Sequence, residues 1–472
     1  MFEEEYRKEM TQVKLSQEQK ERITELMTAA PVRGVRKAGR MALATALVAV
    51  LCLGSVAAAY AMGAFDFLKE QDEYAMLGQG EVYEEFSYAV KQSAVAENGD
   101  VLTVDRAAMD GKFCTIFYSV HFQKPLVSTE ELERMQEDDQ PDLWQLWKIR
   151  STYFTLFTGG EEVSSETYDN SFETMQYLAD ESTLYGAWRF LLKTPLEEGE
   201  LVTLQAELWD TQTPNGEYTS TFLWDLSLDF EAHPIQGEHF EPDVAFPTKI
   251  TNAKGEIETI EARVVSFDRS PLGNQLTLRL ARQGNIHGLR TEYALRDADT
   301  GDYIPYAEIV TAHALDPEGC YDVVYELYGD VRDLKNLELI PVRQIGSISP
   351  RQTVSLDELP STETGNPAGG YAPASYTVGD GQIIVTMQPV GAVTGHYAGI
   401  ANGVSFLDED GDGLFRGLSV QKFKNRQDGT ITVVMTPDAE SFQEDVEKVA
   451  QIWFFVHQYE LLEDQTVSIP LT

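Results

Sequence analysis

One uninterrupted apolar run divides this chain into a short polar segment and a long segment rich in β patterns. The run spans residues 41–65 (MALATALVAVLCLGSVAAAYAMGAF) and contains no charged side chain. A helix that rises about 1.5 Å per residue needs roughly 20 such residues to cross the ~30 Å hydrocarbon core of a bilayer. The pattern therefore predicts a transmembrane helix over residues 41–65.

A cleaved secretion signal is the alternative, because Ala59-Tyr60-Ala61 has the small-x-small pattern that precedes a cleavage site. Signals normally run about 15–30 residues, whereas the leader here would already hold 40 residues before the apolar run, so we favour an uncleaved anchor. Basic residues stay on the cytoplasmic side of a membrane. They crowd the amino side of the run, which predicts a cell-membrane protein with its amino terminus in the cytoplasm and the rest outside: Arg33, Arg36, Lys37 and Arg40.

Beyond a predicted juxtamembrane linker at 66–95, the pattern changes to the alternation typical of strands. It is clearest in residues 219–230 (TSTFLWDLSLDF), where five apolar side chains are expected on one face: Phe222, Trp224, Leu226, Leu228 and Phe230. Runs of this kind predict a first β-sandwich over 96–230. Ser128 and Glu131 form a capping box that predicts a helical insertion within it.

Two further β domains are predicted over 240–345 and 375–472, separated by a linker at 346–374 that is rich in Pro, Gly, Ser and Thr. Both contain an acidic turn with glycine, at 297–302 (DADTGD) and 408–413 (DEDGDG). Both also close on a strand with Leu/Ile-Pro, at 337–342 and 467–472. This weak repeat predicts tandem immunoglobulin-like sandwiches, unless it reflects only shared hairpin chemistry. The expected fold class is mainly β, with one cytoplasmic and one transmembrane helix.

Charge supports the division between the two sides. The first 40 residues carry 9 basic and 7 acidic side chains, a net charge of +2, while the other residues carry 27 basic against 70 acidic, a net charge of −43. So acidic an ectodomain repels phosphates, which argues against nucleic acid as a partner. The three cysteines make no disulfide framework, and Cys114 is expected to be a buried thiol.

Little in the sequence points to chemistry. Asp408, Asp410 and Asp412 match the first half of a calcium loop, but position 12 falls on Ser419 instead of a carboxylate, so a solvated hairpin turn is favoured over calcium. His233 and His239 lie near acidic residues without a recognisable metal-ligand spacing. Ser419 and Lys422 fit the S-x-x-K motif of penicillin-binding enzymes, but neither S-D-N nor K-T-G follows, so chance is the better account. We find no other catalytic motif and expect neither enzymatic activity nor a cofactor.

The inward segment is charged and helix-prone. About 28 residues (3–30) bury too little surface to fold stably alone, and an amphipathic helix of this kind can dock in the groove of a partner. The apolar residues expected to contact a cytoplasmic partner are Leu15, Ile23, Leu26 and Met27. A juxtamembrane helix without a dedicated partner is the alternative.

The segment 6–23 (YRKEMTQVKLSQEQKERI), the basic cluster, the single span and 102–120 (LTVDRAAMDGKFCTIFYSV) together resemble a family of Gram-positive, single-pass membrane proteins described as anti-sigma-factor-like. Residues 260–278 (IEARVVSFDRSPLGNQLTL) resemble the immunoglobulin-like module that often follows in that family. The resemblance implies an inward segment that holds an extracytoplasmic-function sigma factor and an ectodomain of unknown function that senses the envelope. The alternative is a passive surface protein whose ectodomain binds a cell-wall component or another protein.

Overall fold

The computed structural model describes most of the chain beyond residue 62. The described residues are 63–71, 80–128, 150–166, 176–210, 221–251, 257–281, 293–314, 320–345, 351–379, 381–393, 404–415, 419–456 and 458–471. The predicted cytoplasmic segment 1–40, residues 41–62 of the predicted span and the predicted insertion after Ser128 lie outside them. Within the described ranges, no helix combines the length and apolarity needed to cross a membrane.

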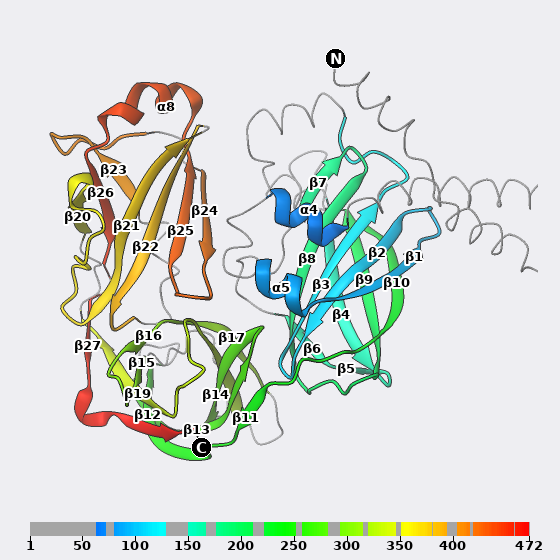
Figure 1. Cartoon of the computed structure of the whole chain (residues 1–472), viewed down its shortest axis with the longest axis horizontal. Helices are drawn as coiled ribbons and strands as arrows, with labels where there is room; N and C mark the ends of the chain where they lie inside the picture. Colours follow the sequence, from blue (N-terminus) through cyan, green and yellow to red (C-terminus); the bar gives the residue numbers. More distant parts are fainter. Residues whose placement is uncertain are drawn as a thin grey trace, which may run out of the picture. The chain divides into compact units, whose positions relative to one another are not determined.

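The described chain is mainly β and builds three sandwiches of antiparallel sheets (Figure 1). The first contains β1 (Tyr88–Val95), β2 (Val101–Met109), β3 (Phe113–His121), β4 (Arg150–Thr158), β5 (Glu161–Glu162), β6 (Ser164–Glu166), β7 (Gln176–Asp180), β8 (Thr183–Leu192), β9 (Leu201–Asp210) and β10 (Thr221–Glu231). Its first sheet has the order β1-β2-β3-β8-β6, with β7 also paired to β8, and its second has the order β10-β9-β4-β5.

The two sheets share one core because alternate side chains of each strand point inward. On β9, for example, Val202, Leu204, Ala206 and Leu208 are buried in that core. The register of β10 shifts between Phe222 and Trp224. Trp224 is buried as predicted, whereas the prediction for Phe222 is wrong: a bulge turns its side chain outward, where it is 46% exposed.

Two helices, α4 (Ala64–Gln71) and α5 (Gly80–Phe86), lie on the first sandwich where the sequence predicted a linker (Figure 1). Phe65 and Tyr83 each pack edge-on against Phe117 of β3, with ring centroids 5.0 and 5.2 Å apart. Phe65 and Leu68 are buried because their i, i+3 spacing puts both on one face of α4. The linker prediction for 66–95 is therefore wrong in its described part, and Phe65, predicted to end the span, packs against protein.

The second sandwich contains β11 (Glu238–Phe240), β12 (Val244–Thr251), β13 (Ile257–Ser270), β14 (Gly273–Ala281), β15 (Tyr293–Asp297), β16 (Tyr303–Ile304), β17 (Tyr306–Ala314), β18 (Cys320–Leu327) and β19 (Asn336–Gln344), joined by β27 (Tyr459–Leu461) and β28 (Val467–Pro470) from the end of the chain. One sheet has the order β11-β13-β14-β18-β17, with β12 also on β13. The other has the order β16-β15-β19-β27, with β28 also on β19.

The last strand therefore completes the second sandwich and not the third. Ile469 of β28 is fully buried in the second core and pairs with Leu337 of β19. The two Leu/Ile-Pro segments that suggested a repeat are thus hydrogen-bonded neighbours in one sheet. The predicted third domain, 375–472, is wrong at its carboxyl end, because β28 pairs with the backbone edge of β19 and places Ile469 in the second core.

The third sandwich is inserted between β19 and β27. It contains β20 (Arg351–Ser355), β21 (Gly369–Gly379), β22 (Gln382–Gly391), β23 (Ser405–Leu407), β24 (Ser419–Lys424), β25 (Ile431–Thr436) and β26 (Gln451–Phe455), with the short helices η1 (Leu356–Glu358), α8 (Ala439–Asp445) and η3 (Val446–Lys448); a further short helix, η4 (Glu463–Gln465), lies between β27 and β28. Its sheets have the orders β21-β22-β25-β24 and β20-β26-β23.

The described part of the predicted linker 346–374 belongs to this third sandwich. Val354 of β20 lies in its core. Thr364 is buried and donates a hydrogen bond to the carbonyl of Asn366 (2.8 Å), and Gln388 donates to the carbonyl of Ser361 (2.8 Å). Polar composition suggested flexibility, but these side chains satisfy backbone carbonyls within the segment, one locally from Thr364 and one from Gln388 of β22, so the linker prediction is wrong for residues 351–374.

Candidate functional site

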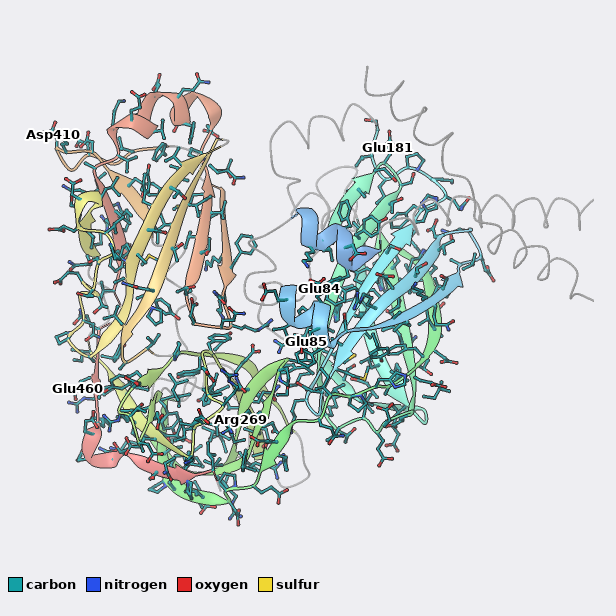
Figure 2. All side chains as sticks on the ribbon, in the orientation of Figure 1. Glu84, Glu85, Glu181, Arg269, Asp410 and Glu460 are labelled. Carbon is teal, nitrogen blue, oxygen red and sulfur yellow. The ribbon has the colours of Figure 1, made fainter. Side chains whose placement is uncertain are left out.

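The predicted calcium ligands lie in a tight turn after β23. The carboxylate of Asp408 accepts hydrogen bonds from the backbone N–H groups of Asp410 (3.0 Å) and Asp412 (2.9 Å), and Asp410 lies at the outer edge of the third sandwich (Figure 2). Across the described ranges, no three His, Cys, Asp or Glu side chains gather as a metal site. Asp408 thus closes a hairpin turn, as Asp297 does in the second sandwich by accepting from Asp299 (2.8 Å).

The two histidines considered as metal ligands have separate partners. His233 Nδ1 lies 2.6 Å from Glu198 of the first sandwich. His239 Nδ1 lies 2.5 Å from Asp268 on β13. Of their acidic neighbours in sequence, Glu241 lies 3.4 Å from His239 Nε2, whereas Glu238 pairs with Arg269 (2.8 Å), which Figure 2 labels in the second sandwich. The two histidines and these carboxylates therefore do not converge on one point.

The strongest constellation in the described chain is a buried charge cluster on Glu326, which we name the junction. It brings together Arg189 of the first sandwich, Glu326 of the second and Arg426 of the third. Arg189 Nη2 lies 2.8 Å from Glu326 Oε1, Arg189 Nη1 lies 3.2 Å from Oε2, and Arg426 Nε lies 3.0 Å from Oε1. Arg189 and Glu326 are each only 1% exposed. One carboxylate is therefore shared by two guanidinium groups from different sandwiches.

Arg189 is held in place by more than its charge. It comes from the outer face of β8, and its Nη2 also donates to the carbonyl of Leu272 in the second sandwich (3.1 Å). Its Cζ atom lies 3.4 Å from the ring centroid of Phe113, the geometry of a cation–π contact. Burial is the largest single influence and acts to lower the pKa of Arg189, but Glu326, Tyr83 and Asp110 together outweigh it and raise the pKa above its ordinary value. The guanidinium group is therefore fully charged.

A second polar link joins the first two sandwiches close by. Asp110, in the turn between β2 and β3, accepts hydrogen bonds from the backbone of Lys112 (2.7 Å) and Phe113 (2.6 Å), and from the hydroxyl of Ser270 in the second sandwich. Burial raises the pKa of the Asp110 carboxyl, against the effect of these hydrogen bonds. Lys112 Nζ also lies 3.5 Å from Asp268 of β13.

The junction is connected to the helices that follow the predicted span. The hydroxyl of Tyr83 on α5 lies 3.1 Å from that of Thr115 on β3, and Thr115 pairs directly with Arg189 across β3 and β8. Tyr83 and Thr115 are both buried. A continuous row of buried groups thus runs from α5 through Thr115 and Arg189 to Glu326.

Apolar contacts surround these polar groups. Phe113 and Leu191 of the first sandwich form one buried cluster with Ala307, Val324 and Tyr328 of the second. The cross-strand partner of Glu326, Gln275, is buried with no hydrogen-bond partner for its amide among the described groups. Burying this amide without a partner costs free energy that an entirely apolar interface would not lose.

Sequence reasoning did not find the junction, although a signal for it exists. β8 reads TLYGAWRFLL, with apolar residues on both faces and a single charge, and nine of its ten residues are buried. A strand that is apolar on both faces must be covered on both. A lone arginine on such a strand therefore requires a buried acidic partner, but the sequence does not say which of many carboxylates provides it.

No protein-family model and no curated protein matches this chain. Among solved structures, a conserved domain protein from Bacillus anthracis aligns with 59% of this chain and 84% of its own, at 11% identity and a TM-score of 0.35. An uncharacterized Listeria monocytogenes protein, crystallised with glucose, magnesium and calcium, aligns with 74% of this chain and 29% of its own, at 8% identity and a TM-score of 0.12. Similarities this distant carry no argument about fold or activity.

Proposed function

We propose that this chain is a single-pass, anti-sigma-factor-like regulator of the cell membrane, with its amino terminus in the cytoplasm and its sandwiches outside. In this proposal the sandwiches sense the state of the envelope. The inward segment binds an extracytoplasmic-function sigma factor, or another cytoplasmic protein, through Leu15, Ile23, Leu26 and Met27.

The observation that carries the proposal is the burial of α4. This helix begins at Ala64, so its first two residues are the last two of the predicted span 41–65, and Ala64, Phe65 and Leu68 are buried on the first sandwich. A passive anchor needs only a flexible tether. A helix packed into the core instead makes the end of the span part of the folded ectodomain. A rearrangement of the ectodomain would then move the end of the transmembrane helix directly.

The junction links the contacts between the sandwiches to the helices that follow the predicted span. A change in the contact between sandwiches alters the environment of Arg189, which connects through Thr115 to Tyr83 on α5. Buried ion pairs are sensitive to geometry because a small displacement leaves a charge without its partner in a medium of low dielectric constant. We infer that the junction has two states and that the envelope signal selects between them.

We further propose that the second and third sandwiches are immunoglobulin-like in architecture. In the described chain the third has sheets of four and three strands, the number in a constant-type immunoglobulin domain. Counted from β21, the order β21-β22-β25-β24 is the A-B-E-D order of that fold, and β23 pairs with β26 as its strand C pairs with strand F. The strand beside β26 at the position of strand G is β20, which precedes the other strands in the chain, so the likeness excludes that one connection.

The test uses the full chain in its own membrane. Tagged wild-type protein is purified in detergent beside Leu26→Asp, with Gln17→Asp as a matched control in the same segment. The regulator proposal predicts that a sigma factor or one other specific cytoplasmic protein co-purifies with the wild type and Gln17→Asp and is lost from Leu26→Asp. Recovery of no specific partner would overturn it in favour of a passive surface protein.

Coupling is tested separately in cells. A reporter driven by the captured partner is compared between the wild type and Glu326→Gln, with surface amounts of the protein matched by external labelling. The proposal predicts that reporter output changes in Glu326→Gln, although this residue is far in sequence from the inward segment. Unchanged output at equal surface amounts would contradict a signalling role for the junction.

A further inference from the structure

The outer face of the second sheet in the first sandwich carries an arrangement that neither the core nor the junction uses. We name it the aromatic face and define it by Tyr153 on β4, Glu207 and Trp209 on β9, and Phe222 and Asp225 on β10. Tyr153 and Phe222 are 42% and 46% exposed, among the most exposed large apolar side chains described.

Strand pairing fixes the order of these residues. Trp209 lies opposite Phe222, and Glu207 lies between Tyr153 on one neighbouring strand and Asp225 on the other. The rings of Trp209 and Phe222 meet edge to face, with centroids 5.2 Å apart and planes at 71°. The indole N–H of Trp209 donates to Glu207 (3.2 Å). The tryptophan is therefore oriented before any ligand arrives.

The bulge in β10 creates this arrangement. Without the register shift between Phe222 and Trp224, strict alternation would place Phe222 in the core beside Trp224. The shift turns it outward beside Trp209, which exposes an apolar ring to water. Bulges that re-aim one side chain in this way are common near functional sites.

The charged side chains of the aromatic face are all acidic. Besides Glu207 and Asp225, it carries Asp229, whose carboxylate accepts a hydrogen bond from Thr203 (2.7 Å). No lysine or arginine lies on this face among the described residues of β4, β9 and β10. A ligand must therefore be cationic if it is to offset the desolvation of these carboxylates.

We propose that the aromatic face binds an amine-bearing polysaccharide, that is, a glycan whose sugar rings carry protonated amino groups. The flat rings cover the apolar faces of sugar rings, and amines bind beside the carboxylates and the electron-rich faces of Trp209 and Tyr153. From Thr203 to Trp209 the face extends about 20 Å along the strand, which suits a linear polymer. An extended basic peptide would instead pair its backbone with a strand edge.

This inference goes beyond the proposed function and does not depend on the inward segment. The experiment measures binding of the purified full chain in detergent to a glucosamine hexamer, with its fully N-acetylated form as the uncharged counterpart and an octalysine peptide as the competing class. The variants are Trp209→Ala and Glu207→Gln. Trp453→Ala is the matched control, because Trp453 lies on the outer face of another sheet, beneath the cation Arg351 (4.5 Å to the ring centroid).

The expected result is saturable binding of the glucosamine hexamer that weakens on the order of fivefold or more in Trp209→Ala and keeps its strength in Trp453→Ala. Glu207→Gln should weaken binding and reduce its salt dependence, and the N-acetylated hexamer should bind less tightly. No binding, or equal loss in Trp453→Ala, overturns the proposal. If Trp209→Ala weakens octalysine binding more than it weakens binding of the glucosamine hexamer, the proposal is also overturned, in favour of a basic protein partner.

Discussion

Arg189 Nη2 lies 2.8 Å from Glu326 Oε1, although the two residues are 137 positions apart in sequence and belong to different sandwiches. Each is 1% exposed. Charges buried this deeply are tolerated only when each has its partner. The relationship therefore ties the folding of the first two sandwiches together, and Arg426 extends that dependence to the third.

Replacing one member of this pair should destabilise the protein strongly. In Glu326→Gln, two arginines keep their charge without the carboxylate, and a loss of about 3–5 kcal/mol is expected in the free energy of unfolding of the sandwiches that meet there. Denaturant unfolding followed by tryptophan fluorescence measures the change. Arg332→Met is the control, since its partner Asp330 is 61% exposed and solvent screens such surface pairs, so little change in stability is expected. Equal effects of the two substitutions would contradict the role of the junction.

Gly273 tests how closely the two sandwiches pack. A Cβ atom added there would lie 2.9 Å from the ring of Phe113 and 3.0 Å from both Arg189 and Glu326. Gly273→Ala should therefore separate the charged pair and cost about 1–3 kcal/mol, the range for overpacking. Hydrogen exchange should rise in β8 and β18. Gly379→Ala is the matched control, because no atom lies within 4 Å of its added Cβ, and protection unchanged by Gly273→Ala would show that the contact is looser than described.

The pH dependence of stability should include a term from His239. Its hydrogen bond to Asp268 raises the pKa of His239 above the usual 6.5, against the effects of burial and of Lys112, with Glu241 as a further acidic neighbour. Because the folded state binds the proton more tightly, this stabilisation is fully present below about pH 6.5 and is lost as pH rises through the folded pKa. The imidazole signals in an NMR titration measure that pKa.

Asp268→Asn supplies the check on this assignment. Without the carboxylate, the pKa of His239 should fall back toward 6.5, and the unfolding midpoint should lose part of its dependence on pH above 6.5. An unchanged titration of His239 in Asp268→Asn would show that another group raises its pKa.

The sequence was most informative where one physical pattern dominates. Period-2 alternation identified β10, because one buried face leaves a clear signal. Short apolar runs rich in β-forming residues identified β3 and β8, which are buried on both faces. The buried thiol of Cys114 was also expected and is found. Phe222 departs from the pattern because a bulge, which alternation does not encode, reverses its direction.

What the sequence did not reveal depends on contacts between distant segments. Composition made residues 351–374 resemble a linker, yet Ser361 and Thr364 are buried and hydrogen-bonded within the third sandwich. The pairing of Arg189 with Glu326 was equally hidden, since the chain offers 77 acidic residues as partners. Such choices are made by tertiary packing, which local propensity does not determine.

The end of the chain gives the last prediction, because β28 belongs to a sandwich more than a hundred residues earlier in sequence. Ile469 is fully buried against the core of the second sandwich. Ile469→Ala should cost about 2–5 kcal/mol in the stability of that sandwich. Hydrogen exchange should increase in β19, which pairs with β28, and in β15, which pairs with β19. The strands β22 and β25 of the third sandwich should keep their protection. Ser468→Ala, exposed on the same strand, should change neither. Loss of protection in β22 and β25 alone would instead assign the last strand to the third sandwich.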